Sequence, residues 1–341
     1  MLSGQRTNRL PSLLCVLTLN VLVNVDLLGA HRIDLHTHII PPFYLDWLKQ
    51  QGYDYGSPPS WNASSHLAFM ESTGILTSVV SITTPGVGPF TSTSDTQEND
   101  ARLMARKLNE FCAFELAGMY PGKFKFWATM TLPDVNGSIA EAHYALKTLK
   151  AAGVILESNK VGLYLGDPAF DSFFKTLDEL RAVVFVHPTY MRKLDALPGL
   201  QQNVLDFTHD LTRAAVNLVF TNTTQKYPHI TFIFANAAGA LPFVAYRAAL
   251  SSKYYSASVM LDEFQKFFYE TSFSTSPSAM PTLLEFASAD RLVFGSDWPN
   301  GVSFGAAFYT QILDSYSMPD ENRGKINSSN IEELWKRIRS F

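Results

Sequence analysis

Short runs of β-branched and aromatic residues recur along this chain, and longer amphipathic stretches separate them. Several runs are apolar almost throughout, as in residues 183–186 (VVFV) and 231–235 (TFIFA). Such runs are typical of parallel strands, because helices cover both faces of a parallel sheet and leave no side of the strand in water. We therefore predict eight strands, at residues 32–38, 77–83, 124–130, 153–159, 182–188, 230–237, 267–273 and 291–297.

The stretches between these runs have the spacing of amphipathic helices, at residues 95–120, 139–152, 171–181 and 206–226. Strands that alternate with helices in this way predict an α/β fold, a closed (β/α)8 barrel of the TIM type. Such a barrel takes roughly 250 residues. The chain has 341 residues, which is enough for one such barrel. At the C-terminal end we expect a loop and then a final surface helix at residues 330–339. We therefore predict a single barrel domain over residues 31–341.

Residues 1–30 precede the predicted barrel as an apolar N-terminal extension. Two arginines come before an apolar run at residues 10–28, which ends in Gly29-Ala30 as a signal-like segment does. Three polar residues interrupt the run, and a membrane span needs about 20 cleanly apolar residues. A working signal segment and an unprocessed extension therefore both remain open.

Charge and cysteine content narrow the kind of protein. The formal net charge is −4 and no long basic run occurs, so we expect no nucleic-acid partner. The two cysteines, Cys15 and Cys112, offer no disulfide within residues 31–341. Their scarcity favours a reducing compartment.

Metal-competent side chains stand at three of the predicted strand ends. In a TIM-type barrel these carboxyl ends face the reaction site. The first strand ends in His36 and His38, which point to the same side because they are two residues apart. The fifth strand ends in His187 and the eighth in Asp297. Three imidazoles and one carboxylate suit Zn²⁺, and also Mn²⁺ or Fe²⁺.

Each of these residues also has a simpler explanation. A lone His-x-His pair is common in loops, His187 before a proline can simply end a strand, and Asp297 can cap a helix. The combination is more specific than any member, because all the elements fall at predicted strand ends. We therefore predict that His36, His38, His187 and Asp297 hold one divalent metal. We expect this metal to be Zn²⁺, with Mn²⁺ as the alternative.

A resemblance to a known family rests on four motifs, at residues 33–42 (IDLHTHIIPP), 185–188 (FVHP), 239–242 (GALP) and 294–299 (FGSDWP). The chain resembles the metal-dependent amidohydrolase-2 group, which includes aminocarboxymuconate-semialdehyde decarboxylase and the γ-resorcylate decarboxylases. Within the group it is most similar to fungal 6-methylsalicylate decarboxylases. The resemblance covers nearly the whole chain after Ala30, and it implies the same four metal ligands.

The chain departs from the family pattern at Asn236. The family has histidine there, and the resemblance implies that this histidine orients or activates a metal-bound water or assists proton transfer. Asparagine forms hydrogen bonds but does not take up a proton near neutral pH. We expect retained activity with Asn236 in an auxiliary catalytic role. Lys160 lies beyond the fourth predicted strand, whereas the bridging lysine of two-metal amidohydrolases lies on it, so we expect one metal.

Three functional hypotheses follow. The first is a carboxy-lyase that decarboxylates an ortho-hydroxybenzoate without oxidation, with 6-methylsalicylate giving m-cresol and CO₂ in polyketide secondary metabolism, and with Asp297 as proton donor by resemblance. The second is a metal-dependent hydrolase of a lactone or amide, which Asn236 disfavours because it is no base. The third is a degenerate, non-catalytic barrel, which Asn236 supports.

The first hypothesis also fixes the expected partners and compartment. The partner is a small aromatic carboxylic acid, and we expect a homodimer because barrels of this group tend to pair. The resemblance implies a cytosolic protein. The alternative is the endoplasmic reticulum or secretion, if residues 10–30 act as a signal segment.

Overall fold

In a computed structural model, the chain is described at residues 31–88, 95–190, 197–253, 255–300 and 305–339. The predicted extension, residues 1–30, lies outside these ranges. Eight strands form one sheet in the order β1-β2-β3-β4-β7-β8-β9-β10, and the pairs joined by strand ladders are all parallel. These strands are β1 (Arg32–His38), β2 (Ile75–Ser81), β3 (Phe124–Thr129), β4 (Gly153–Glu157), β7 (Val183–His187), β8 (Thr231–Phe234), β9 (Phe268–Glu270) and β10 (Leu292–Val293).

Backbone hydrogen bonds between β1 and the segment after β10 close the sheet into a barrel. Leu35 N–H donates to the carbonyl of Phe294 at 3.0 Å, and Asp297 N–H donates to the carbonyl of His36 at 2.7 Å. His38 N–H continues the ladder by donating to the carbonyl of Trp298 at 2.7 Å. The predicted (β/α)8 barrel is confirmed, and its closing ladder runs directly past the predicted metal ligands.

Large side chains fill the barrel interior, as in other barrels of this class. Trp127 of β3 is 1% exposed, and its indole N–H donates to the carbonyl of Leu35 at 2.8 Å. Its ring stacks on Phe185 of β7, with the ring centroids 5.6 Å apart. Every residue of β7 is buried, which agrees with its continuous apolar run. The interior is therefore a packed core, and chemistry is confined to the barrel ends.

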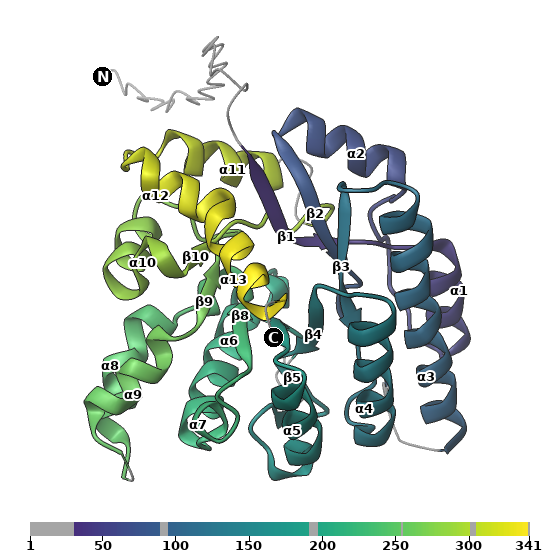
Figure 1. The fold of residues 1–341 in the computed structure, drawn as a ribbon, viewed down its shortest axis with the longest axis horizontal. Helices are drawn as coiled ribbons and strands as arrows, with labels where there is room; N and C mark the ends of the chain where they lie inside the picture. The colour runs from purple at the N-terminus through teal and green to yellow at the C-terminus, as the bar shows by residue number, and fades with distance from the viewer. Residues whose placement is uncertain (1–30, 89–94, 191–196, 254, 301–304, 340–341) are drawn as a thin grey trace, which may run out of the picture.

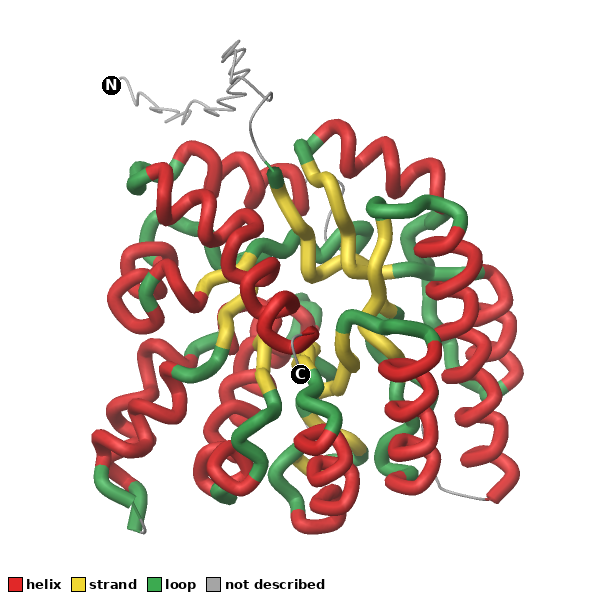
Figure 2. Tube along the Cα trace, in the orientation of Figure 1, coloured by secondary structure: helices red, strands yellow, loops and turns green. Residues whose placement is uncertain are grey.

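Helices surround the strands in both views (Figure 1; Figure 2). The helices are α1 (Pro42–Gln50), α2 (Ala63–Ser72), α3 (Asp95–Glu110), η1 (Phe111–Gly118), α4 (Val135–His143), η2 (Tyr144–Thr148), η3 (Pro168–Phe170), α5 (Asp171–Glu179), α6 (Gln202–Phe220), α7 (Thr223–Lys226), η4 (Ala235–Ala238), α8 (Leu241–Ser251), α9 (Ala257–Gln265), α10 (Ala279–Ala287), η5 (Ala289–Arg291), α11 (Gly305–Ser315), α12 (Asp320–Gly324), η6 (Lys325–Ser329) and α13 (Asn330–Arg339). Within the described ranges, no helix is both long enough and apolar enough to cross a membrane.

The last helix, α13, lies across one end of the barrel, in front of the strands in Figure 1. Ile331 and Leu334 on this helix are buried, and Lys125 near the start of β3 lies 5.2 Å from the ring of Trp335. The helix therefore covers the end where the strands begin. The carboxyl ends of the strands, which carry the predicted ligands, lie at the opposite end.

The later strands are shorter than we predicted from the sequence. The run predicted at residues 230–237 stops at Phe234 and continues as the turn η4, and the runs at 267–273 and 291–297 shorten to β9 and β10. Polar and small residues end each strand and enter the loops of the site. The predicted loop before residue 330 was also wrong, because α12 and η6 lead directly into α13. A two-stranded hairpin, β5 (Asn159–Lys160) with β6 (Leu163–Tyr164), follows β4 and was not predicted.

Candidate metal centre

Four side chains from distant parts of the chain meet at the carboxyl ends of the strands. One ligand atom from each of His36, His38, His187 and Asp297 lies within 4.8 Å of the others. The Nε2 atoms of His36 and His38 are 3.1 Å apart, and Asp297 Oδ1 lies 3.4 Å from the first and 3.0 Å from the second. The structure thus brings together all four residues that the sequence singled out.

The other ring nitrogen of each histidine has a protein partner. His36 Nδ1 lies 2.8 Å from Glu270 Oε2, and His187 Nδ1 lies 2.8 Å from the carbonyl of Pro188. These oxygens accept, so each ring donates from Nδ1 and directs its Nε2 atom toward the cluster. His38 Nδ1 lies 3.2 Å from the hydroxyl of Ser81. Metal-bound histidines are held in the same way by carboxylates and carbonyls.

This arrangement fits a divalent cation. Asp297 Oδ1 is buried and has no hydrogen-bond partner among the described residues, although imidazole nitrogens surround it. The ring nitrogens and the carboxylate oxygen converge closely enough to act together as the ligands of one cation. Three imidazoles and one carboxylate are a donor set that Zn²⁺ and Mn²⁺ accept.

The electrostatics of the cluster also favour positive charge. Burial lowers the pKa of His36, but the carboxylates of Asp297 and Glu270 outweigh it and raise the pKa to about 9. Burial lowers the pKa of His187 well below its ordinary value, and the two neighbouring imidazoles lower it further. Burial raises the pKa of Asp297, but the histidines outweigh it and bring the pKa to about 2. The carboxylate is therefore ionised, and it attracts a cation.

A buried aspartate ties the two halves of the centre together. Asp34 Oδ1 accepts hydrogen bonds from the backbone N–H of His36 at 3.0 Å and from that of Ser296 at 3.1 Å. Burial raises the pKa of Asp34 to about 7. This residue joins β1 to the segment that carries Asp297, so it fixes how two of the candidate ligands face each other.

Sequence reasoning missed Glu270, which ends β9 and is fully buried. Its carboxylate accepts from His36 Nδ1, from the hydroxyl of Ser272 at 2.8 Å and from the backbone N–H of Ser272. Gly295 leaves room for it, because a Cβ atom there would lie 2.2 Å from Glu270 Oε1. The available signal was a single acidic residue at the end of the apolar run 267–270 (FFYE).

Asn236 belongs to the same network. It lies in η4 with a left-handed φ of 47°, and not on the predicted strand. Its backbone N–H donates to Glu270 Oε2 at 3.1 Å, and its side-chain Nδ2 donates to the hydroxyl of Ser272 at 2.8 Å. Asn236 thus contacts the two residues that orient His36.

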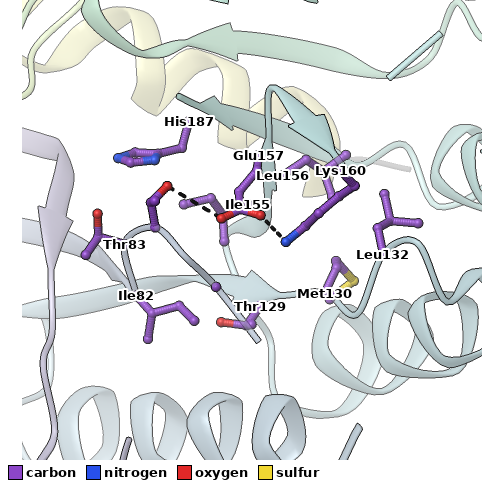
Figure 3. Close-up of a pocket in the computed structure, with 12 residues that line it drawn as sticks. Ile82, Thr83, Thr129, Met130, Leu132, Ile155, Leu156, Glu157, Lys160 and His187 are labelled. Atoms are coloured by element: carbon purple, nitrogen blue, oxygen red, sulfur yellow. Dashed lines mark hydrogen bonds and ion pairs between the residues drawn. The ribbon is translucent and has the colours of Figure 1, made fainter. Parts of the chain in front are cut away.

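A pocket opens beside His187 and carries a second charged group (Figure 3). Lys160 and Glu157 form an ion pair there, and both side chains are about nine-tenths buried. Neither residue joins the four-residue cluster. From the sequence, we expected Lys160 to lie beyond the fourth strand and therefore not to bridge two metals. The structure places it in the wall of this pocket.

The barrel and this cluster are those of the metal-dependent amidohydrolases. The sequence profile described as "Amidohydrolase" matches residues 33–337, so the chain belongs to the amidohydrolase family. The resemblance drawn from the motifs is therefore confirmed.

Two similar proteins in the family are named as decarboxylases. The chain is 29% identical over 322 residues to "6-methylsalicylic acid decarboxylase" of Penicillium expansum, which covers 91% of this chain and 98% of that protein. It is 32% identical over 310 residues to "Decarboxylase yanB" of Aspergillus niger, covering 85% and 83% of the two chains. The expectation of a carboxy-lyase is confirmed by these relatives.

A solved structure has the same fold at low identity. A 5-carboxyvanillate decarboxylase of Novosphingobium aromaticivorans, complexed with manganese and 4-hydroxy-3-methoxy-5-nitrobenzoic acid, superposes with a TM-score of 0.77. It is 21% identical and covers 90% of this chain and 96% of that chain. At this identity the likeness shows the fold.

Proposed function

We propose that this protein is a metal-dependent, non-oxidative decarboxylase of an ortho-hydroxybenzoate, and that 6-methylsalicylate is its first candidate substrate. The observation that carries the proposal is the four-residue cluster, in which three imidazole nitrogens and one buried carboxylate oxygen converge. The names of the relatives support the reaction and the substrate. We propose His36, His38, His187 and Asp297 as the ligands of one divalent ion, Zn²⁺ or Mn²⁺.

When bound, the cation supplies a Lewis acid and template for the carboxylate and phenolic oxygens of the substrate. Asp297 is placed to move the proton, because it is the one carboxylate in the cluster. It takes the phenolic proton of the substrate and gives it to the ring carbon that bears the carboxylate. A C–H bond forms, and the C–C bond to the carboxylate breaks. CO₂ leaves, while the electron pair of the broken C–C bond stays with the ring and restores its aromaticity. A proton from solvent then returns to the phenolic oxygen.

In this scheme Asn236 assists the reaction without carrying a proton. Its contacts are with Ser272 and Glu270, which hold His36 in place. Decarboxylation needs no activated water, so an asparagine at this position is compatible with turnover. A hydrolase needs a base that deprotonates water, and Asn236 is not one.

The test supplies 6-methylsalicylate to protein loaded with one equivalent of Mn²⁺ or Zn²⁺ and measures m-cresol and CO₂. The proposal expects both products in equal amounts and none from protein without metal. If metal is demonstrably bound and no m-cresol forms, this substrate is excluded. Hydrolysis of a lactone panel without release of CO₂ would instead favour a hydrolase.

A further inference from the structure

A fully buried aspartate lies on the inner face of α6. Asp210 is 0% exposed, and Ala214 and Leu218, which share its face of the helix, are buried as well. Burial of a carboxylate among apolar neighbours costs free energy unless hydrogen bonds replace its lost hydration. An apolar side chain would meet no such cost here, so the role of Asp210 lies in the groups that it binds.

Three donors from the chain segment after β4 bind the carboxylate of Asp210. Asn159 donates to Oδ2 through its side-chain amide at 3.0 Å, and Tyr164 donates to Oδ1 through its hydroxyl at 2.8 Å. The third donor is the hydroxyl of Ser158, which also binds Oδ2. Asn159 and Tyr164 belong to the hairpin of β5 and β6, whereas Ser158 lies between that hairpin and the end of β4. Asp210 therefore holds the hairpin and the end of β4 together.

Ser158 connects this carboxylate to the candidate ligand His187. Glu157, which precedes Ser158, is paired in register with His187, and both line one pocket (Figure 3). The backbone N–H of Ser158 donates to the carbonyl of His187 at 2.8 Å, and its hydroxyl accepts from the backbone N–H of Thr189 at 3.1 Å. A serine hydroxyl has a single proton to donate. Because that proton goes to Asp210, a lone pair of the hydroxyl is left for the N–H of Thr189.

The peptide group between Pro188 and Thr189 is held on both sides. Its N–H donates to Ser158, and its carbonyl accepts from His187 Nδ1 and from the hydroxyl of Thr84, each at 2.8 Å. A peptide group is planar, so a rotation that takes the N–H away from Ser158 also turns the carbonyl away from His187. All of these groups are buried, so water is not at hand to replace a lost partner. The orientation of the His187 ring therefore depends on Ser158.

We infer that Ser158 and Asp210 are positioning residues, which set the direction in which His187 presents Nε2 to the metal. This inference rests on the metal site of the proposed function. Neither side chain belongs to the four-residue cluster, and both act through the peptide group that His187 binds. Changes to residues behind metal-bound histidines weaken metal affinity by roughly 10- to 100-fold. We expect about tenfold for Ser158→Ala, because its contact lies one hydrogen bond further from the ring.

The experiment measures Mn²⁺ affinity of the full chain by competition with a chelator, for Ser158→Ala and for the matched control Tyr164→Phe. The control also removes a hydrogen bond to Asp210, but it leaves the bond between Ser158 and Asp210 in place. We expect Ser158→Ala to bind Mn²⁺ about tenfold more weakly and Tyr164→Phe to stay within about threefold. The visible absorption of bound Co²⁺, which reports ligand geometry, should change in Ser158→Ala and not in Tyr164→Phe.

A third variant, Asp210→Leu, tests whether the two residues act as one unit. It should weaken Mn²⁺ binding in the natural chain and add no further loss in the Ser158→Ala background, because residues of one network are not additive. If this variant fails to fold in thermal melting, the comparison of Ser158→Ala with Tyr164→Phe still decides.

The inference is overturned if Ser158→Ala keeps its Mn²⁺ affinity and Co²⁺ spectrum, or if Tyr164→Phe changes both equally. Release of CO₂ by the unmodified chain would then still support the proposed function. Conversely, a metal-loaded chain that releases no CO₂ from 6-methylsalicylate would exclude that substrate and leave the affinity comparison valid. An unmodified chain that binds neither Mn²⁺ nor Zn²⁺ would overturn both the inference and the proposed ligands.

Discussion

Glu270 offers a sharp test of how the metal centre is built, because it contacts His36 without being a candidate ligand. Its Oε2 accepts from His36, Ser272 and Asn236, and its Oε1 accepts from the backbone N–H of Ser272. The change Glu270→Gln keeps the volume but offers a single acceptor oxygen. With the N–H₂ group at the Oε1 position, the backbone N–H of Ser272 loses its acceptor and the bond to His36 loses its charge. With the N–H₂ group at the Oε2 position, His36, Asn236 and Ser272 all lose their acceptor.

The expected magnitude follows from these contacts. A hydrogen bond to a charged group contributes roughly 1.5–3 kcal/mol, against roughly 0.5–1.5 kcal/mol for a neutral one. Losing the charge and one acceptor therefore costs about 1.5–3 kcal/mol, which is roughly a 10- to 100-fold weaker metal affinity. Changes to residues behind metal-bound histidines have effects of this size.

The assay is competition for Mn²⁺ or Zn²⁺ against a chelator of known affinity, at constant pH. Glu263→Gln is the matched control, because Glu263 on α9 is also a buried glutamate but pairs with Lys266, the residue that follows this helix. If the Glu270 variant binds metal within threefold of the unmodified protein, Glu270 does not strengthen metal binding through His36. An equal loss in the control would show a general effect on folding instead.

Three further predictions concern proton transfer, the family departure and pH. Asp297→Asn should lower kcat by at least roughly 10²–10⁴-fold, the typical cost of losing a positioned acid, measured as CO₂ release at saturating metal; a fall of less than tenfold would remove Asp297 as donor. Asn236→His should change kcat/KM by less than about tenfold, whereas a gain of 10² or more would show that the natural chain is impaired. His66, buried on α2, has its pKa lowered to about 3 by burial and by the charge of His38. The unfolded chain then binds more protons below pH 6.5, so stability falls as the pH drops toward 3. At pH 5 this effect lowers the free energy of unfolding by about 2 kcal/mol. We expect the difference in free energy of unfolding between pH 7.5 and pH 5, measured with urea, to be smaller by this amount in His66→Gln. An unchanged difference would show that the pKa of His66 is not lowered in the folded chain.

The barrel and the four-residue cluster could both be predicted from the sequence, because both depend on local signals. Strands such as β7 are apolar along their whole length, and His36, His38, His187 and Asp297 stand where such runs end. The carboxyl ends of all the strands in such a barrel lie at the same end, so these residues meet there.

The supporting residues were harder to predict, because their roles depend on contacts across the barrel. Glu270 reaches His36 across 234 positions of sequence, and no local pattern marks that pair. Asn236 was expected on a strand, but the chain turns into a left-handed conformation there. The pairing of Glu157 with His187 depends on the register of β4 and β7, which the sequence does not state. The predicted homodimer and cytosolic location stay predictions.

We propose that release of CO₂ requires one divalent ion, held by His36, His38, His187 and Asp297. In the test, metal-stripped protein is titrated with Mn²⁺ while CO₂ release from 6-methylsalicylate is followed. We expect activity to rise in proportion to added metal and to saturate at one equivalent per chain. Activity that persists without metal, or that saturates only at two equivalents, would contradict it.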